Sequence, residues 1–454
     1  MTTNGNGSDK SLGLGKLLAY SSGQFGGNIL NYTMAGWIIY FYTDTEKGPP
    51  YLSIFIIGAI GMLVGRIADG IYDPIIGYWS DTTRTRWGRR IPFILLSTPF
   101  YAGAFTLLFN PLFPKGSAAL AVFTILLISV YFFFFTANMV PYLALMPEIS
   151  TSNSDRVKTT TFMTIAGLLA NLYAMVAVPK LFPVLGESGV FTMTGGLAVI
   201  FILVTVFLVK EKPMDAATAA PVNKKEYSLL YAFRLTFRNK AFTNYIAASF
   251  CQYIGFAALT SSLPFVVTRL MDKPKDYVGN LFGAAFPGMA VSFVIINWLV
   301  KSRGVEKAKL YKVCLFLLAA FMPLMFLLNR VDLGVPPHVA GMIFMVLMSF
   351  PITGNQVLPM AILADITDYD EKLTGMRREG VYFSMQGFLQ KIATALSLGM
   401  QSILFGVFGF AVGGPRDFLG VSLLGPIAGL FGLVGFLIFL KYPLDEKTKE
   451  MKSA

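Results

Sequence analysis

Histidine and cysteine are nearly absent from this chain of 454 residues, which has one histidine and two cysteines. Cys251 and Cys314 lie inside apolar runs, so the sequence indicates neither a disulfide framework nor a metal cluster built from cysteine and histidine. His338 follows two prolines and belongs to no recognisable catalytic triad, and the phosphate-binding and dinucleotide-binding glycine motifs are missing. We therefore expect a protein that is not an enzyme and that holds no cofactor.

Charged residues are also scarce, at 14% of the chain, whereas hydrophobic residues make up 55%. Twelve apolar runs are long enough to cross the ~30 Å hydrocarbon core of a membrane. They lie at residues 19–42, 52–78, 91–110, 118–146, 160–181, 188–209, 241–268, 277–300, 308–329, 337–364, 381–411 and 418–440. The pattern predicts an all-α polytopic membrane protein with twelve transmembrane helices. Because no cleavage site precedes the first run, we expect that helix to be retained.

A net charge of +12 would suit a nucleic-acid partner, but the basic residues sort by loop instead of forming a binding patch. One set of loops, which includes both ends of the chain, carries most of them. The other set carries only Lys47, Lys115, Lys180, Arg269, Lys273, Lys275, Arg330 and Arg416. The positive-inside rule then predicts a protein of the inner membrane with both termini in the cytoplasm. We expect no nucleic-acid partner.

A long polar connection separates six of the runs from the other six. The boundaries that we expect are a cytoplasmic N-terminus at 1–18, a six-helix bundle at 19–209, a cytoplasmic linker at 210–240, a second six-helix bundle at 241–441 and a cytoplasmic tail at 442–454. The halves also repeat, because residues 143–150 match residues 360–367 and a basic loop follows each. Internal duplication of this kind is typical of transporters whose halves rock about a central site.

Three formal charges interrupt the apolar run at 52–78. Arg66, Asp69 and Asp73 lie three and four residues apart, so a helix aligns them on one stripe. In hydrocarbon each charge costs at least ~2.5 kcal/mol, so the stripe must face a partner, a cavity or an ion. Lys391 is the remaining charge deep in an apolar run. Either these charges form a functional ion site, or an ion pair only joins two helices and Lys391 extends to the membrane surface.

Polar side chains inside the runs are the candidates for a substrate site, together with one methionine that neighbours them. The candidates are Asn28, Asn31, Tyr32, Asn138, Met139, Gln356 and Gln386. Converging amides and hydroxyls suit a sugar, whereas Met139 and the phenylalanines at 132–135 would suit an apolar slot for a lysolipid. Asn28 has the alternative of a hydrogen bond between helices.

Charged residues at the ends of the runs are expected to pair and to close an inner gate. These residues are Asp81, Arg84, Arg89, Arg90, Glu148, Asp365 and Arg378. The alternative is that the arginines only set the membrane topology.

Two pairs of motifs resemble the glycoside-pentoside-hexuronide cation symporter family, typified by the melibiose carrier. The first pair is the run Asp69–Pro74 with the basic segment that begins at Arg84, and the second is Ala364–Tyr369 with Arg378–Ser384. The resemblance covers essentially the whole chain. It implies the major facilitator fold, with twelve helices in two six-helix halves and transport by alternating access.

The resemblance also implies roles for particular residues. Asp69 and Asp73 match the family's cation-site carboxylates, Thr136 matches its hydroxyl ligand, and Lys391 matches its lysine counter-charge, to which Arg66 would add a second. Tyr72 is a further candidate ligand, but it stands where the melibiose carrier has an asparagine. The choice between sodium and proton as coupling ion therefore stays open, and we expect no other metal.

The substrate site departs further from the family pattern. Asn28 and Met139 occupy positions where the melibiose carrier has aspartates, so recognition of galactosides is not implied. We expect a symporter, active as a monomer, that imports a sugar or glycoside, with this small molecule and membrane lipid as its partners. The alternatives are a lysophospholipid symporter, whose animal representative keeps the aspartates and the lysine, and a transport-inactive sensor of the same fold.

Overall fold

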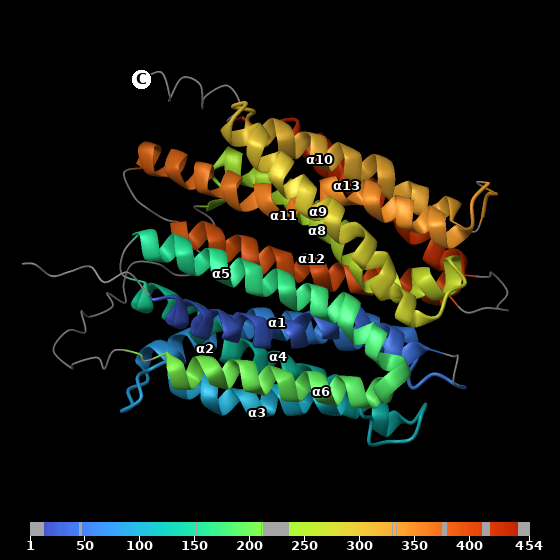
Figure 1. Ribbon diagram of the computed structural model, residues 1–454, viewed down its shortest axis with the longest axis horizontal. Coiled ribbons are helices and arrows are strands. Elements are labelled where there is room, and N and C mark those ends of the chain that lie inside the picture. The colour runs from blue at the N-terminus through green and yellow to red at the C-terminus, as the bar shows by residue number, and fades with distance from the viewer. Residues whose placement is uncertain are drawn as a thin grey trace, which may run out of the picture. The chain divides into compact units, whose positions relative to one another are not determined.

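The computed structural model describes residues 13–44, 48–150, 153–209, 211, 236–328, 330–332, 334–374, 379–410 and 418–443. Nearly all of these residues are helical, and none of them lies in a strand (Figure 1). The first elements are α1 (Leu14–Thr43), the π-helical segment η1 (Phe55–Met62), α2 (Leu63–Thr82), α3 (Ile91–Leu108), α4 (Ala118–Ile149), α5 (Asn153–Leu172), the π-helical segment η2 (Tyr173–Ala177) and α6 (Val178–Leu208). The later elements are α8 (Lys240–Phe265), η3 (Val266–Leu270), η4 (Lys275–Tyr277), α9 (Val278–Lys301), α10 (Lys307–Phe321), η5 (Met322–Leu327), α11 (Pro337–Thr374), α12 (Glu379–Phe408) and α13 (Leu419–Phe439).

The helices have the length and apolar composition of membrane crossings, as the sequence predicts. Ten segments of the described chain meet both conditions. One of them, Lys158–Leu208, has 51 residues, about twice the length that one crossing needs. Its helix breaks at Gly186, whose positive φ of 69° ends one crossing and begins the next. With α1, a 30-residue helix that is not among these ten, the described residues have twelve helical stretches long enough to cross a membrane.

The chain forms two compact units. Unit 1 contains the described parts of Met1–Met34, Ala68–Leu112 and Leu126–Ala220, and unit 2 contains those of Ala35–Ile67, Phe113–Ile125 and Pro221–Ala454. The last turns of α1, the segment η1 and the start of α4 therefore belong with the later helices. The two six-helix domains that we expect from the sequence stay a prediction.

In unit 1, α1 approaches α4 and α6 closely. The Tyr20 and Tyr142 hydroxyls each donate a hydrogen bond to the other residue's carbonyl oxygen, both at 2.7 Å, and the two rings stack with centroids 4.6 Å apart. A Cβ on Gly26 would lie 2.8 Å from the Ala198 carbonyl oxygen, so only glycine allows this approach of α1 to α6.

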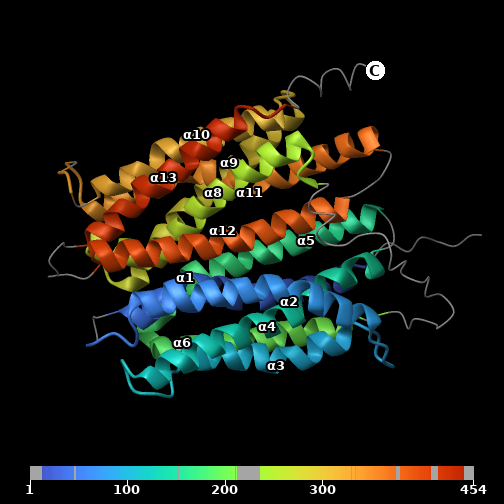
Figure 2. The same cartoon turned by 180° about the vertical axis from the view of Figure 1, so that it is seen from behind.

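In unit 2, the buried core lies among α8, α10, α11, α12 and α13 (Figure 2). Fully buried aromatic residues from different helices meet in it, including Phe242 of α8, Tyr311 of α10 and Tyr382 of α12. The Tyr245 hydroxyl donates to the Pro359 carbonyl oxygen at 2.9 Å and so joins α8 to α11. Because tyrosine supplies a large apolar ring and a donor, these contacts satisfy polar groups inside an otherwise apolar bundle.

Candidate functional site

The charged stripe on α2 is helical, as predicted, and one of its aspartates is fully buried. Asp69 has no exposed surface, and its Oδ1 accepts a hydrogen bond of 2.7 Å from the Thr136 hydroxyl of α4. Both residues belong to unit 1. The structure thus brings together the carboxylate and the hydroxyl that the family resemblance assigns to one cation site.

The other members of the stripe lie on the same helix. Asp73 is one turn after Asp69 and is partly buried, and the Tyr72 ring packs edge to face on Phe133 with centroids 5.2 Å apart. Arg66 is buried one turn before Asp69. Tyr72 is therefore positioned by the aromatic part of α4. Its hydroxyl as a cation ligand stays a prediction.

Lys391 belongs to unit 2 and lies in the middle of α12, twelve residues after Glu379 at the helix start, where it is partly buried. That depth agrees with the sequence analysis. Its pairing with the aspartates of unit 1 stays a prediction.

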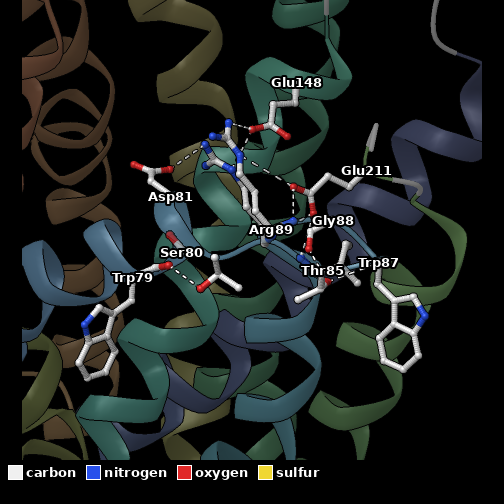
Figure 3. A network of polar contacts seen from close by, with 12 residues as sticks. Trp79, Ser80, Asp81, Thr85, Trp87, Gly88, Arg89, Glu148 and Glu211 are labelled. Atoms are coloured by element: carbon white, nitrogen blue, oxygen red, sulfur yellow. Dashed lines mark hydrogen bonds and ion pairs between the residues drawn. The ribbon is translucent and has the colours of Figure 1, made fainter. Parts of the chain in front are cut away.

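A network of charged side chains joins the loop before α3 to the end of α4 (Figure 3). The Arg89 guanidinium donates to Glu148 Oε1, and Arg90 Nε lies 2.9 Å from the same oxygen in an ion pair without hydrogen-bond geometry. Arg90 also donates to Asp81 Oδ1 at 3.3 Å. The pairing of these four residues is as predicted. Their action as a gate is a separate matter and stays a prediction.

Glu211, just after the end of α6, binds backbone amides of the segment whose arginine side chains form this network. Its side chain is 2% exposed, Oε1 accepts from the Arg89 amide at 2.9 Å, and Oε2 accepts from the amides of Arg90 and Ile91 at 2.9 and 3.2 Å. The N-cap residue of α3, Arg90, makes no capping bond with its own side chain. Glu211 therefore supplies the acceptors and the negative charge that a helix N-terminus favours.

The loop bends sharply where it meets Glu211. The Thr85 hydroxyl donates to the Gly88 carbonyl oxygen and accepts from the Trp87 amide, while Gly88 has a φ of +100°. A Cβ on Gly88 would lie 2.1 Å from Glu211 Oε2, so this position requires glycine for two reasons. Sequence reasoning missed Glu211, although it is an isolated acid between two lysines directly after an apolar run.

The protonation state of the network follows from its contacts. Burial alone would lower the pKa of the Arg89 guanidinium, but the hydrogen bond and charge of Glu148, with the charges of Asp81 and Glu211, raise it above its ordinary value. Arg89 therefore stays positively charged over the physiological range of pH.

The other predicted gate residues lie elsewhere. Asp365 on α11 pairs with Lys307 at the start of α10, with the Lys307 Nζ 2.6 and 2.8 Å from the two carboxylate oxygens. Arg84 is exposed in the loop before α3. Arg378 lies outside the described residues.

The predicted substrate residues of unit 1 fall into two groups. The Asn138 side-chain nitrogen donates to three oxygens of α3, those of Ile94, Ser97 and Thr98, at 3.1 to 3.2 Å. Its donors are thus used in packing α4 on α3, and Met139 beside it contacts Gly27 of α1. Asn28 donates to the Gln24 carbonyl oxygen one turn earlier, whereas Asn31 and Tyr32 are only partly buried. The donor of Asn28 is therefore also used within the protein, and the substrate roles of Asn28, Asn31 and Tyr32 stay predictions.

In unit 2, buried amides keep hydrogen-bonding atoms uncommitted. Gln386 Oε1 accepts from the Tyr245 hydroxyl at 3.0 Å, whereas its Nε2 has the Tyr253 hydroxyl as a neighbour but makes no bond of full hydrogen-bond geometry among the described residues. Oε1 of Gln252 and Oδ1 of Asn355 also lack such a bond there, and all three side chains are at most 2% exposed. Gln356, also predicted, is exposed on α11.

Comparison with known proteins now identifies the family. Residues 19–446 match the family described as MFS/sugar transport protein. The chain belongs to this family. A lactose permease of Lactobacillus helveticus is 25% identical over 86% of this chain and 63% of its own length. Sodium-dependent lysophosphatidylcholine symporter 1 of Xenopus tropicalis is 22% identical over 91% of this chain and 84% of its own length.

A solved structure agrees with the fold of this MFS protein. The crystal structure of a single-residue mutant of nucleoside transporter NupG superimposes with a TM-score of 0.68 and 13% identity, over 94% of this chain and 99% of that one. At such low identity the likeness shows the fold alone, and it confirms the predicted major facilitator fold. The chain is therefore an MFS membrane transport protein, and the family and its structural neighbours are transporters and not enzymes.

Proposed function

We propose that the protein is a cation-coupled secondary symporter that imports a sugar or glycoside by alternating access. The observation that carries this proposal is the fully buried Asp69, hydrogen-bonded by Thr136 with Asp73 one turn away. A buried carboxylate in a membrane helix is expensive unless a cation, a proton or a counter-charge accompanies it. A site that alternates among these states couples ion movement to conformation.

The ligand chemistry suits either coupling ion. Carboxylate and hydroxyl oxygens are the ligands that hard cations prefer, so Asp69, Asp73 and Thr136 suit sodium, and the carboxylates equally suit a proton. In the empty carrier, Lys391 and Arg66 would balance the carboxylates. The arriving cation would then displace Lys391.

The test of the cation site uses Thr136 and Asp69. Replacing Thr136 with valine keeps the shape but removes the hydroxyl, so we expect cation-driven uptake to fall about tenfold or more. Thr136→Ser keeps the hydroxyl and should retain most of the uptake. Asp69→Asn should abolish accumulation driven by a sodium or proton gradient in vesicles. If both Asp69→Asn and Asp73→Asn accumulate substrate like the unmodified protein, the coupling proposal is wrong.

Uncommitted buried amides support a sugar as the substrate. Each buried donor or acceptor without a partner costs about 1–3 kcal/mol, and a polyhydroxylated molecule can supply both kinds of partner. Gln386 and Gln252 in unit 2 and Asn31 in unit 1 each keep such an atom. The lactose permease among the relatives supports the same class.

A lysophospholipid is the second candidate, and one observation favours it. The lysophosphatidylcholine symporter is about as similar to this chain as the lactose permease is. Met139 and the phenylalanines of α4 would then line an apolar slot for the acyl chain.

Thermal unfolding of the purified protein with sugars, uronides and lysophospholipids distinguishes these substrates. A bound substrate stabilises by RT ln(1 + [L]/Kd), so the true class should raise the melting temperature with dose, and more so with the coupling cation. Gln386→Ala should remove that shift. Gln401→Ala on the same helix is the control, because Gln401 is already committed to Ser261 at 2.6 Å and its loss should lower stability without removing the shift. A shift with lysophospholipids alone would favour the second candidate.

The remaining parts of the proposal concern orientation. The positive-inside rule supports placing both termini and the network around Glu148 on the cytoplasmic side, in the inner membrane. The protein would work as a monomer with membrane lipid around it. The ion pairs of Glu148 and Asp365 would close the cytoplasmic side in one conformation and separate in the other.

A further inference from the structure

Three charged side chains with little exposed surface meet just after the end of α1. Asp44, which directly follows α1, lies 3.8 Å from an Arg269 nitrogen through Oδ1 and 3.5 Å from the Lys275 Nζ through Oδ2. The three side chains are 9%, 7% and 13% exposed. All three residues belong to unit 2, although Asp44 lies more than 220 positions earlier in the chain. The contact therefore joins the early part of the chain to the late part.

An aromatic contact accompanies these charges. Tyr40, one turn before Asp44, presents its ring 5.9 Å from the Lys275 Nζ and packs edge to face on Phe265 at 5.1 Å between centroids. The Asp44 amide donates to the Tyr40 carbonyl oxygen at 2.8 Å, so the last turn of α1 continues to the carboxylate. Arg269 and Lys275 come from η3 and η4, which follow Phe265. The end of α1 thus contacts η3 and η4 through the ion pairs of Asp44 and through the Tyr40 ring.

The next early segment, η1, lies directly against α12. A Cβ on Gly58 of η1 would lie 1.7 Å from the Ser402 Oγ, and a Cβ on Gly406 of α12 would lie 2.2 Å from the Phe55 ring. At both positions a glycine lets the backbone of one helix contact a side chain of the other, and a larger residue would not fit. This second contact also joins early and late parts of the chain within unit 2.

The chemistry of these contacts suits a surface that separates and reforms. If an apolar contact opened to water, it would expose hydrocarbon, whereas carboxylate, guanidinium and ammonium groups are strongly solvated once apart. When closed, the buried opposite charges attract at reduced dielectric. A permanent joint between two helices can be made by apolar contacts alone. Contacts at glycine, where no side chains interlock, can also separate without a change of side-chain rotamer.

We propose that Asp44, Arg269 and Lys275, with the contact between Gly58 and Ser402, form an outer latch that holds this end of the carrier closed in one conformation and opens in the other. The proposal rests on alternating access as proposed above. It assigns Asp44 a conformational role that is separate from ion and substrate binding. Losing the Asp44 charge should shift the population toward the open state.

Cross-linking tests the latch without knowledge of the substrate. Cys251 and Cys314 are replaced with alanine, Gly58→Cys and Ser402→Cys are introduced, and a protease site is placed in the linker at 210–240 so that a cross-link keeps the two fragments together on a gel. Because the two positions touch, we expect rapid disulfide formation in membranes treated with an oxidant. Asp44→Asn should slow it by about fivefold or more, since breaking a buried pair shifts the equilibrium strongly.

Exchanging the charges of Asp44 and Lys275 should restore the closed contact. Asp44→Lys combined with Lys275→Asp should restore the cross-linking rate, whereas Asp44→Lys alone should be at least as slow as Asp44→Asn. Asp332→Asn is the matched control, because Asp332 is exposed in unit 2 and its carboxylate accepts a hydrogen bond from the nearby Gly334 amide. Equal rates in Asp44→Asn, Asp332→Asn and the parent would overturn the latch. If Asp44→Asn fails to fold, Lys275→Gln replaces it and must slow the cross-link as well.

The outcomes separate this proposal from the proposed function. A cross-link that responds to Asp44 in a protein that accumulates no solute would support the latch as a conformational device and overturn the symporter. Cation-driven uptake with a cross-link that ignores Asp44 would overturn the latch alone.

Discussion

Two ion pairs occupy matched places in the internal repeat, but their surroundings differ. Glu148 near the end of α4 and Asp365 on α11 correspond in the repeated segments 143–150 and 360–367. Glu148 receives two arginines whose backbone is fixed by Glu211, whereas Asp365 receives one lysine side chain. Lys307 and Asp365 are 32% and 37% exposed, so water screens them. An ion pair is thus present at both places, and among the residues that the structure describes a carboxylate fixes the backbone of the partner only at Glu148.

The anchoring matters because a side chain is held only as firmly as its backbone. Glu211 binds three consecutive amides with a carboxylate that is 2% exposed. Arg89 and Arg90 consequently start from a fixed position and lose less conformational entropy when they bind Glu148. We expect the unit 1 network to behave as a rigid element and the unit 2 pair to exchange readily with water.

Removing the Glu211 carboxylate, which fixes the backbone of Arg89 and Arg90, should have the largest effect on stability. Glu211→Ala leaves three backbone amides without their acceptor and removes the negative charge at the start of α3, so we expect a loss of about 3 kcal/mol of stability. The measurement is the midpoint of thermal unfolding of the purified protein in detergent. Glu211→Gln keeps one acceptor oxygen and should lie between Glu211→Ala and the parent. An unchanged midpoint in Glu211→Ala would show that water replaces the carboxylate without cost.

Placing a methyl group against the Glu211 carboxylate should have the next largest effect on stability. Gly88→Ala places a methyl group on Glu211 and forces a non-glycine residue to a φ of +100°, so we expect a loss of about 2 kcal/mol. Unfolding midpoints again provide the measurement. Gly77→Ala is the control, because nothing lies within 4 Å of a Cβ at that glycine of α2 and its φ is helical. If both variants lose the same stability, the close approach of Glu211 to Gly88 has no energetic role.

Neutralising the centre of the network should have a smaller effect. Glu148→Gln weakens two partly buried ion pairs but keeps a hydrogen-bond acceptor, so we expect a loss of about 1 kcal/mol. If the network is a cytoplasmic gate, the same variant should also increase the labelling of cysteines placed on that side. Stability that falls while labelling stays constant would assign Glu148 to packing alone.

Sequence patterns predicted the helices well because a membrane requires long apolar runs. The predicted run at 91–110 corresponds to α3, and those at 160–181 and 188–209 lie on either side of the break at Gly186. The ends were less predictable, since α11 continues ten residues beyond its apolar run, to Thr374. Helices that leave the membrane need no apolar residues, so hydropathy cannot mark where they end.

The site was predictable only in part. The pairing of Asp69 with Thr136 came from family resemblance, because spacing along one helix says nothing about which face of α4 it meets. Asn138 shows the same limit, since the rotation of α4 directs it to α3. The charges of Asp44, Arg269 and Lys275 were each visible at predicted loop ends, but the sequence alone does not show which ends meet. Glu211 was not predicted, because a charged residue beside a polar linker is expected to be exposed to water.

The unit 2 pair offers the smallest and most discriminating effect. Lys307 and Asp365 are about one-third exposed, so Asp365→Asn should cost only about 0.2–1 kcal/mol, and raising the salt from 0.05 to about 1 M should remove most of that difference by screening. Unfolding midpoints of Asp365→Asn and the parent at both salt concentrations provide the measurement. The loss in Glu211→Ala should persist in high salt, because buried amides that lack an acceptor are not screened. If the Asp365 effect equals that of Glu211 and resists salt, burial and backbone anchoring do not explain the difference between the two repeats. The second pair would then have to be held by contacts other than those of Lys307.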